Sequence, residues 1–192
     1  LPYIASSVTI NRIEVWVTNK RGNYDQARNI VALADLGEND ERHIMHSEWI
    51  SPVGSRTPHN KANKLYETLV EEHSGVRDIQ QVSQVMQGIG GMELGEAYEK
   101  VESARLLNSG EYTLNAALGY ISLKTALNQD EVLAVAYEYT YAGQVYQVGE
   151  FSTDASESLK APNALLLKLL KSTNNAPNQK GKGTWDLMMK NI

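Results

Sequence analysis

Residues 133–148 read LAVAYEYTYAGQVYQV, and this stretch decides the class of fold. Apolar or aromatic side chains recur at every second position of 133–141, which is the period of a β-strand with two distinct faces. The dipeptide Ala142-Gly143 separates this run from a second one over 144–148, as in a two-residue hairpin. The stretch therefore predicts an antiparallel hairpin and a fold built around a sheet.

Four tyrosines share one face of this hairpin: Tyr137, Tyr139, Tyr141 and Tyr146. In the predicted register Tyr139 lies opposite Tyr146 and Tyr137 lies opposite Val148, and each such pair contributes roughly 0.2–1 kcal/mol relative to a pair of alanines. We expect the rings to pack within the sheet, because a tyrosine buries its ring while its hydroxyl stays in water. The alternative is an aromatic platform that stacks on sugar rings.

Outward from the hairpin, short apolar or alternating runs predict six further strands. Turn signals such as Asp35-Leu36-Gly37 end these runs. The predicted strands cover residues 8–18, 30–34, 43–50, 97–106, 111–116 and 120–123.

Between these strands the apolar spacing changes to three- and four-residue steps, which predicts two helices, over 61–73 and 78–87. Asp78 and Gln81 resemble a capping box at the start of the second helix. The glycines at 88, 90 and 91 end it.

A third helix is predicted after Pro162, because proline suits a first helical turn and an apolar stripe of Leu165, Leu166, Leu169 and Leu170 follows. Strands and helices together predict an α+β protein. We expect a β-sandwich, jelly-roll or galactose-binding-like, decorated with a helical insertion at about 60–90.

The end of the chain has a different composition. Residues 172–183 are rich in Asn, Lys and Gly, which predicts a mobile linker after a domain over 1–171. The linker precedes an apolar cluster within 172–192, which we expect to dock on the rest of a larger protein. A final strand or helix of this same domain is the alternative. The predicted docking residues are Trp185, Leu187, Met188 and Met189.

Composition excludes several classes of protein. The 192 residues carry a net charge of −5 with both signs scattered, which argues against a nucleic-acid partner. No apolar run approaches the ~18 residues of a membrane-spanning helix, so we expect a soluble chain without a direct membrane span. The chain has no cysteine, which excludes disulfides, thiolate nucleophiles and cysteine-ligated metals. It begins Leu1-Pro2 without a signal peptide, so we expect an excised piece or a processed chain.

The residue types that carry chemistry do not form a known pattern. His43 and His46 would point to opposite sides of the predicted strand, so we expect no metal site. The glycines at 88, 90 and 91 follow a helix rather than a strand, unlike those of a phosphate-binding loop. No serine lies in a G-x-S-x-G elbow. We therefore expect no catalytic residues and no cofactor.

Four segments resemble a known family. They read IEVWVT at 13–18, RNIVALADLGE at 28–38, VYQVGEFS at 145–152 and WDLMMKN at 185–191. In this order they resemble a domain of the SprA family, giant outer-membrane proteins of gliding motility and type IX secretion that are also called Sov.

This resemblance implies a function. Members of the family resemble very large transmembrane β-barrels that conduct folded cargo proteins across the outer membrane, with soluble domains inserted between barrel strands. It implies that this chain is one such soluble domain, with no catalytic residues to carry over. We expect a non-catalytic structural or interaction domain, associated with the outer membrane on its cell-surface rather than its periplasmic side.

Its expected partners are the remainder of the translocon, cargo proteins and accessory secretion subunits. The alternative function is a carbohydrate-binding or adhesive cell-surface module, motivated by the strands and the tyrosines. An enzyme ranks third, because no motif supports one.

Overall fold

The computed structural model describes residues 7–52, 56–174 and 184–189. The described chain contains β-strands, two α-helices and four short 3-10 helices. The strands are β1 (Val8–Val17), β2 (Arg28–Leu33), β3 (Tyr98–Leu106), β4 (Tyr112–Asn115), β5 (Tyr120–Leu123), β6 (Leu133–Tyr141), β7 (Gln144–Val148) and β8 (Leu165–Lys171). The helices are α1 (Leu65–Glu71), α2 (Val82–Gln87), η1 (Ser47–Trp49), η2 (Ser74–Arg77), η3 (Glu157–Leu159) and η4 (Thr184–Leu187).

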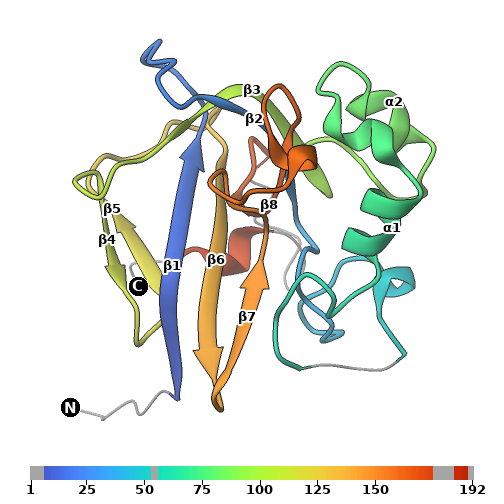
Figure 1. Cartoon of the computed structure of the whole chain (residues 1–192), viewed down its shortest axis with the longest axis horizontal. Helices are drawn as coiled ribbons and strands as arrows, with labels where there is room; N and C mark the ends of the chain where they lie inside the picture. Colours follow the sequence, from blue (N-terminus) through green and yellow to red (C-terminus); the bar gives the residue numbers. More distant parts are fainter. Residues whose placement is uncertain (1–6, 53–55, 175–183, 190–192) are drawn as a thin grey trace.

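One sheet closes on itself to form a barrel (Figure 1). Its strands follow the order β1-β3-β2-β8-β6, and β1 also pairs with β6, from Val8 opposite Tyr141 to Val17 opposite Leu133. β2 and β8 run parallel, while the other neighbours in the ring are antiparallel. The predicted sandwich of two sheets is therefore wrong, and the fold is a closed five-stranded barrel.

Small side chains explain why so few strands can close. Inside the barrel, fully buried alanines lie beside the large rings of Trp16 and Phe151. Small inward residues leave room for strongly curved strands around a narrow, filled interior. Irregular pairing within β1–β6 and β2–β3 adds local twist, as β-bulges do. The inward alanines are Ala32, Ala104, Ala134 and Ala136.

The outer face of the barrel is also covered. Figure 1 shows α1 and α2 on one side of the barrel and the two-stranded β4–β5 sheet on the other. The helices pack on outward residues of β2 and β8, such as Leu33 and Leu166. The β4–β5 hairpin packs on outward residues of β1 and β6, such as Val15 and Val135. None of the described helices is long and apolar enough to cross a membrane.

The predicted β6–β7 hairpin is confirmed. Tyr139 pairs with Tyr146 and Tyr137 with Val148, as expected. Both turn residues have positive φ, 49° at Ala142 and 79° at Gly143. Two successive positive values are what a type I′ turn requires.

The third predicted helix is wrong, because residues 165–171 form β8. Leu165, Leu167 and Leu169 point into the barrel, whereas Leu166 packs under the helices. A strand buried on both faces reads as a continuous apolar run, and its leucines also match helical spacing.

The predicted strand over 43–50 is wrong too. This segment forms turns and η1, and the Asp35 carboxylate accepts hydrogen bonds from the N–H groups of Met45 and His46. A side chain thus satisfies backbone groups that a strand would pair.

The two predicted helices between β2 and β3 are present but shorter, as α1 and α2, and Gly88 caps α2. Most of the predicted linker, 175–183, lies outside the described residues.

Candidate functional site

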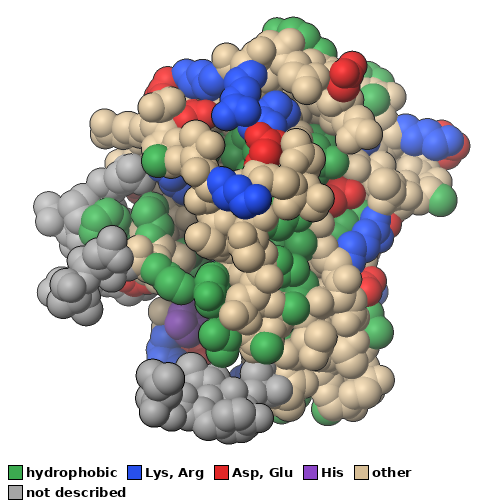
Figure 2. Space-filling view, turned by 90° about the vertical axis from the view of Figure 1, so that its left-hand side faces the viewer, with side chains coloured by type: hydrophobic (Ala, Val, Ile, Leu, Met, Phe, Trp, Pro, Cys, Tyr) green, Lys and Arg blue, Asp and Glu red, His purple; other side chains and the backbone are tan. Residues whose placement is uncertain are grey.

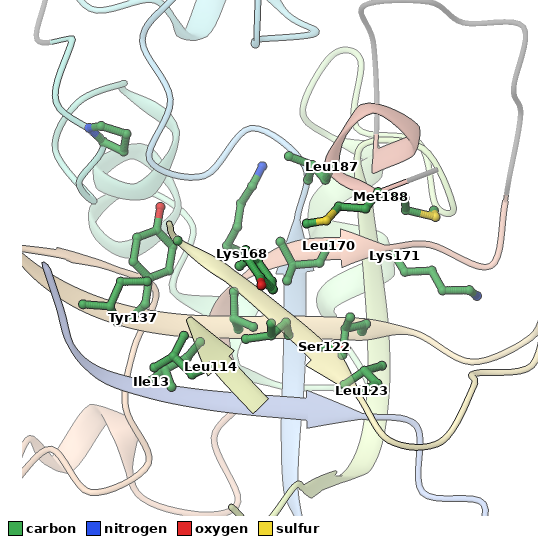
Figure 3. Close-up of a pocket in the computed structure, with 18 of the residues that line it drawn as sticks. Ile13, Leu114, Ser122, Leu123, Tyr137, Lys168, Leu170, Lys171, Leu187 and Met188 are labelled. Carbon is green, nitrogen blue, oxygen red and sulfur yellow. The ribbon is translucent and has the colours of Figure 1, made fainter. Parts of the chain in front are cut away.

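A pocket of about 860 Å³ lies between the β4–β5 hairpin and the outer face of the barrel (Figure 3). We call it the hairpin pocket. Its floor consists of alternate residues of β6, Leu133, Val135 and Tyr137, which point outward from the barrel. Residues 119–123 form one wall, and β8 contributes Leu170. The walls are therefore mostly apolar.

The mouth of the hairpin pocket is rimmed by exposed apolar side chains. Tyr120 belongs to β5, and Leu187 and Met189 come from the C-terminal segment. Leu187 is 49% exposed and Met189 is 73% exposed. On the face with β4 and β5, Figure 2 shows hydrophobic side chains gathered among polar ones. Contiguous exposed apolar groups usually mark an interaction site.

The inner end of the hairpin pocket is polar. Lys168 is 6% exposed, and its ammonium group donates to the backbone carbonyl of Ala34 and pairs with Glu38 Oε1. The other carboxylate oxygen, Glu38 Oε2, is buried without a hydrogen-bond partner in the described structure. The polar end thus holds an ion pair with one unsatisfied acceptor.

A turn at Gly37 positions Glu38. Gly37 has a φ of 89°, and a Cβ there would lie 2.9 Å from a methyl group of Val148. Only glycine fits both the positive φ and this close approach without strain. The turn lies after β2, which pairs with β8, and it brings Glu38 within contact of Lys168 on β8.

Burial controls the protonation of this end. Loss of solvent raises the pKa of Glu38 to about 7, an effect that the ammonium of Lys168 opposes and the carboxylate of Asp35 reinforces. The pKa of Tyr137 lies well above its usual range, because the phenol is buried and the charge of Glu38 is near. At neutral pH, Glu38 therefore exists in both protonation states.

The four predicted tyrosines do not form one exposed platform. Tyr137 and Tyr139 line the hairpin pocket. Tyr139 is 4% exposed, donates its hydroxyl hydrogen to the carbonyl of Pro58 at 2.5 Å, and stacks on Tyr146 with ring centroids 5.4 Å apart. Tyr141 is the most exposed of the four.

Three of the predicted docking residues reach the hairpin pocket. Leu187, Met188 and Met189 line its mouth, and Figure 3 shows Leu187 and Met188 next to Leu170 of β8. Trp185 is half-buried and lies outside the lining. In the structure, the C-terminal segment thus packs beside its own barrel and leaves apolar groups exposed.

Sequence reasoning missed Lys168, Glu38 and the contribution of β5. A signal existed for Lys168, since it is the one charge in the run LLLKLL at 165–170. A buried lysine needs a partner, so a paired carboxylate could have been sought. Nothing in the sequence identified Glu38 as that partner, because the pairing depends on β2 and β8 being neighbours.

Two other buried carboxylates have full sets of partners. Glu14 accepts from the Trp16 indole at 3.2 Å and from the backbone and hydroxyl of Ser152 at 3.0 Å. Glu150 pairs with Arg77. These contacts hold segments together, and neither carboxylate has a buried oxygen without a hydrogen-bond partner in the described residues.

The histidines do not assemble into a centre. His43 is exposed and His46 is half-buried. Across 7–52, 56–174 and 184–189, no three His, Asp or Glu side chains are grouped so that they could hold a metal ion. Comparison with protein-family models and with curated proteins finds no match to this chain.

Proposed function

We propose that this chain is a non-catalytic interaction domain of a large outer-membrane translocon of the SprA family, acting in type IX protein secretion and gliding motility. In this proposal the domain docks on the remainder of its parent protein through the rim of the hairpin pocket. The observation that carries the proposal is the row of exposed apolar side chains at that rim, Tyr120, Leu187 and Met189.

The physical argument concerns the energy of these side chains. Burying a large apolar side chain contributes roughly 1.5–3 kcal/mol. Two or three such groups on one rim are enough to hold a domain in place on a larger body. Left in water, the same groups favour association with another surface.

Three of the four segments that resemble the family contribute residues to this site. Ile13 of the first segment, Glu38 of the second, and Leu187 and Met188 of the last all line the hairpin pocket. These segments are far apart in the sequence. That they come together at the hairpin pocket supports the proposal that this pocket and its rim are the functional surface.

Cargo proteins and accessory secretion subunits are further proposed partners, with the domain on the cell-surface side of the outer membrane. The carbohydrate-binding alternative rests on the tyrosine row. Because Tyr139 is buried and Tyr137 lies in the floor of the hairpin pocket, the tyrosine row offers a sugar ring no flat exposed surface.

The test uses the full-length parent protein. Leu187→Ser with Met189→Ser is expected to abolish cargo secretion while the thermal midpoint of the isolated chain stays the same. Leu94→Ser is the matched control, because Leu94 is exposed and lies outside the pocket lining. Normal secretion by the double variant would contradict docking at the rim. A parent gene without transmembrane strands would contradict the assignment to the family.

A further inference from the structure

The interior of the hairpin pocket has the features of a small-molecule site. Ligand pockets typically enclose about 300–1,000 Å³, with apolar walls and a few polar groups that fix orientation. The hairpin pocket has a volume of about 860 Å³, with a wall from β5 and a floor from β6. Lys168, which is buried, and Glu38, whose side chain is 17% exposed, form the ion pair at its polar end.

We propose that the hairpin pocket binds a neutral long-chain amphiphile, with the chain along β5 and β6 and a hydroxyl head that contacts both Lys168 and Glu38. This proposal goes beyond docking and does not depend on it, because docking uses the exposed rim and the ligand uses the interior. A partner that covered the rim would close the pocket over its ligand.

The polar end specifies a group that both donates and accepts a hydrogen bond. The Lys168 ammonium has three N–H groups, and its described partners are the carbonyl of Ala34 and Glu38 Oε1. Glu38 Oε2 is buried and has no donor in the described residues. A hydroxyl group can accept from Lys168 and donate to Glu38 Oε2, which satisfies both.

The charges favour a neutral head over a carboxylate. At the pH 8 of the binding test, which lies above the pKa of Glu38, Lys168 and the ionised Glu38 neutralise each other. A ligand carboxylate would add a buried negative charge beside Glu38, and an uncompensated buried charge is costly. A hydrocarbon without a head would leave Glu38 Oε2 unsatisfied, which also costs free energy.

The apolar walls specify the rest of the ligand. Leu133, Val135 and Leu170 present aliphatic side chains, and Ile121 and Leu123 of the β4–β5 hairpin pack against the same cluster. Figure 3 shows Leu123 and Leu170 among the lining residues. An unbranched alkyl chain can bend to follow such a surface. Each CH₂ group of the chain that leaves water adds to the affinity.

The binding test compares three ligands of equal chain length, tetradecan-1-ol, tetradecanoate and tetradecane. Each displaces Nile red from the purified chain at pH 8. We expect tetradecan-1-ol to bind at least about tenfold more tightly than either competitor, a difference of about 1.4 kcal/mol. Equal binding of all three, or no displacement by the alcohol, overturns the proposal.

Two variants locate the ligand. Leu170→Trp fills the pocket from β8 and is expected to weaken binding of tetradecan-1-ol about tenfold or more. Leu118→Trp is the matched control, because Leu118 is exposed near the hairpin turn and lies outside the pocket lining. Circular dichroism confirms the fold of both variants. Equal loss in both variants, or no loss in Leu170→Trp, overturns the proposal.

Glu38→Gln tests the head group independently of Leu170→Trp. It removes the negative charge, so tetradecanoate is expected to bind more tightly and the preference for the alcohol to shrink. An unchanged preference overturns the role of the polar end. Sedimentation of the purified chain as a dimer that dissociates in Leu170→Trp would assign the pocket to a second copy instead.

Discussion

Arg77 and Glu150 form a two-pronged ion pair that joins the helical segment to the barrel. The guanidinium nitrogens lie 2.6 Å and 2.9 Å from the two carboxylate oxygens. Glu150 also accepts from the Tyr66 hydroxyl at 2.9 Å and from the N–H of Leu166 at 2.8 Å. Glu150 is buried and Arg77 is partly buried, so the carboxylate has little contact with water and depends on Arg77 for its counter-charge.

Arg77→Met is expected to destabilise the chain by about 3–5 kcal/mol, because it leaves the buried Glu150 carboxylate without its counter-charge. Urea denaturation followed by circular dichroism measures the change. Arg42→Met is the control, since Arg42 pairs with Asp40 on the surface, and its midpoint is expected to match the parent chain. Equal midpoints for both variants would show that the pair does not hold the helices to the barrel.

The β6–β7 turn gives a second prediction. Gly143 has a φ of 79° and no atom lies within 4 Å of a Cβ built there, so a side chain meets backbone strain but no clash. Gly143→Val is expected to cost about 1–3 kcal/mol, and Gly143→Asn less, because asparagine tolerates positive φ. Thermal midpoints check the order. A valine variant as stable as the asparagine variant would contradict the turn geometry.

Sequence patterns predicted those strands in which apolar and polar residues alternate and a recognisable turn follows. Residues 133–148 alternate along both strands and carry a turn dipeptide, so element, register and facing pairs were all predictable. β8 was not, because its leucines are buried on both faces and alternation disappears. Within the run 165–170, the single charged residue Lys168 was the one sequence feature that indicated a polar partner on one face.

Closure of the sheet could not be predicted in the same way. Alternation shows which residues share a face but not whether the two edge strands pair, and β1 and β6 are separated by more than a hundred residues. Both faces of the last four residues of β1 are buried, with Trp16 inside the barrel and Val15 under the β4–β5 hairpin. The candidate site has the same origin, because Glu38 and Lys168 meet only when β2 and β8 are adjacent.

The narrow interior of the barrel gives a third prediction. Ala136 is fully buried, and a Cβ at Gly149 would lie 3.1 Å from its Cα and Cβ, so the space is filled. Ala136→Leu is expected to destabilise the chain by about 1–3 kcal/mol or more through overpacking. Val145→Leu is the control, because Val145 is exposed. Equal unfolding midpoints for Ala136→Leu and Val145→Leu would mean that the barrel interior can hold a larger side chain, which would contradict a filled interior.

Glu38 gives a prediction of pH dependence. Its usual pKa is 4.5, and in the folded chain it is about 7. Between these values the folded chain holds a proton that the unfolded chain has released. The stabilising contribution is therefore complete below pH 4.5 and is lost as pH rises through 7.

Glu38→Gln removes this titration while Lys168, Asp35 and Tyr137 remain in place. The free energy of unfolding of the parent chain minus that of the variant is expected to fall from pH 5 to pH 8, by on the order of 3 kcal/mol. Urea titrations at each pH measure it. A constant difference across this range would contradict the raised pKa of Glu38.

The last prediction separates the C-terminal segment from the end of β8. The Glu99 carboxylate is buried and accepts from the Ser172 hydroxyl at 2.9 Å, the Thr173 N–H at 2.8 Å and the Thr173 hydroxyl at 2.6 Å. These residues therefore belong to the barrel, although their composition resembles that of a linker. Truncation after Asn174 keeps all three hydrogen bonds, whereas truncation after Lys171 removes them.

We expect truncation after Asn174 to change the thermal midpoint little, because Leu187 and Met189 remain largely exposed in the intact chain. Truncation after Lys171 is expected to cost about 1–3 kcal/mol more, since a buried carboxylate then lacks its donors. Glu99→Gln, combined with each truncation, controls for this effect, because a neutral amide is less costly to leave unpaired than a charge. A large loss of stability on truncation after Asn174 would assign Trp185 and its neighbours to the core of this domain and remove the docking role of the segment.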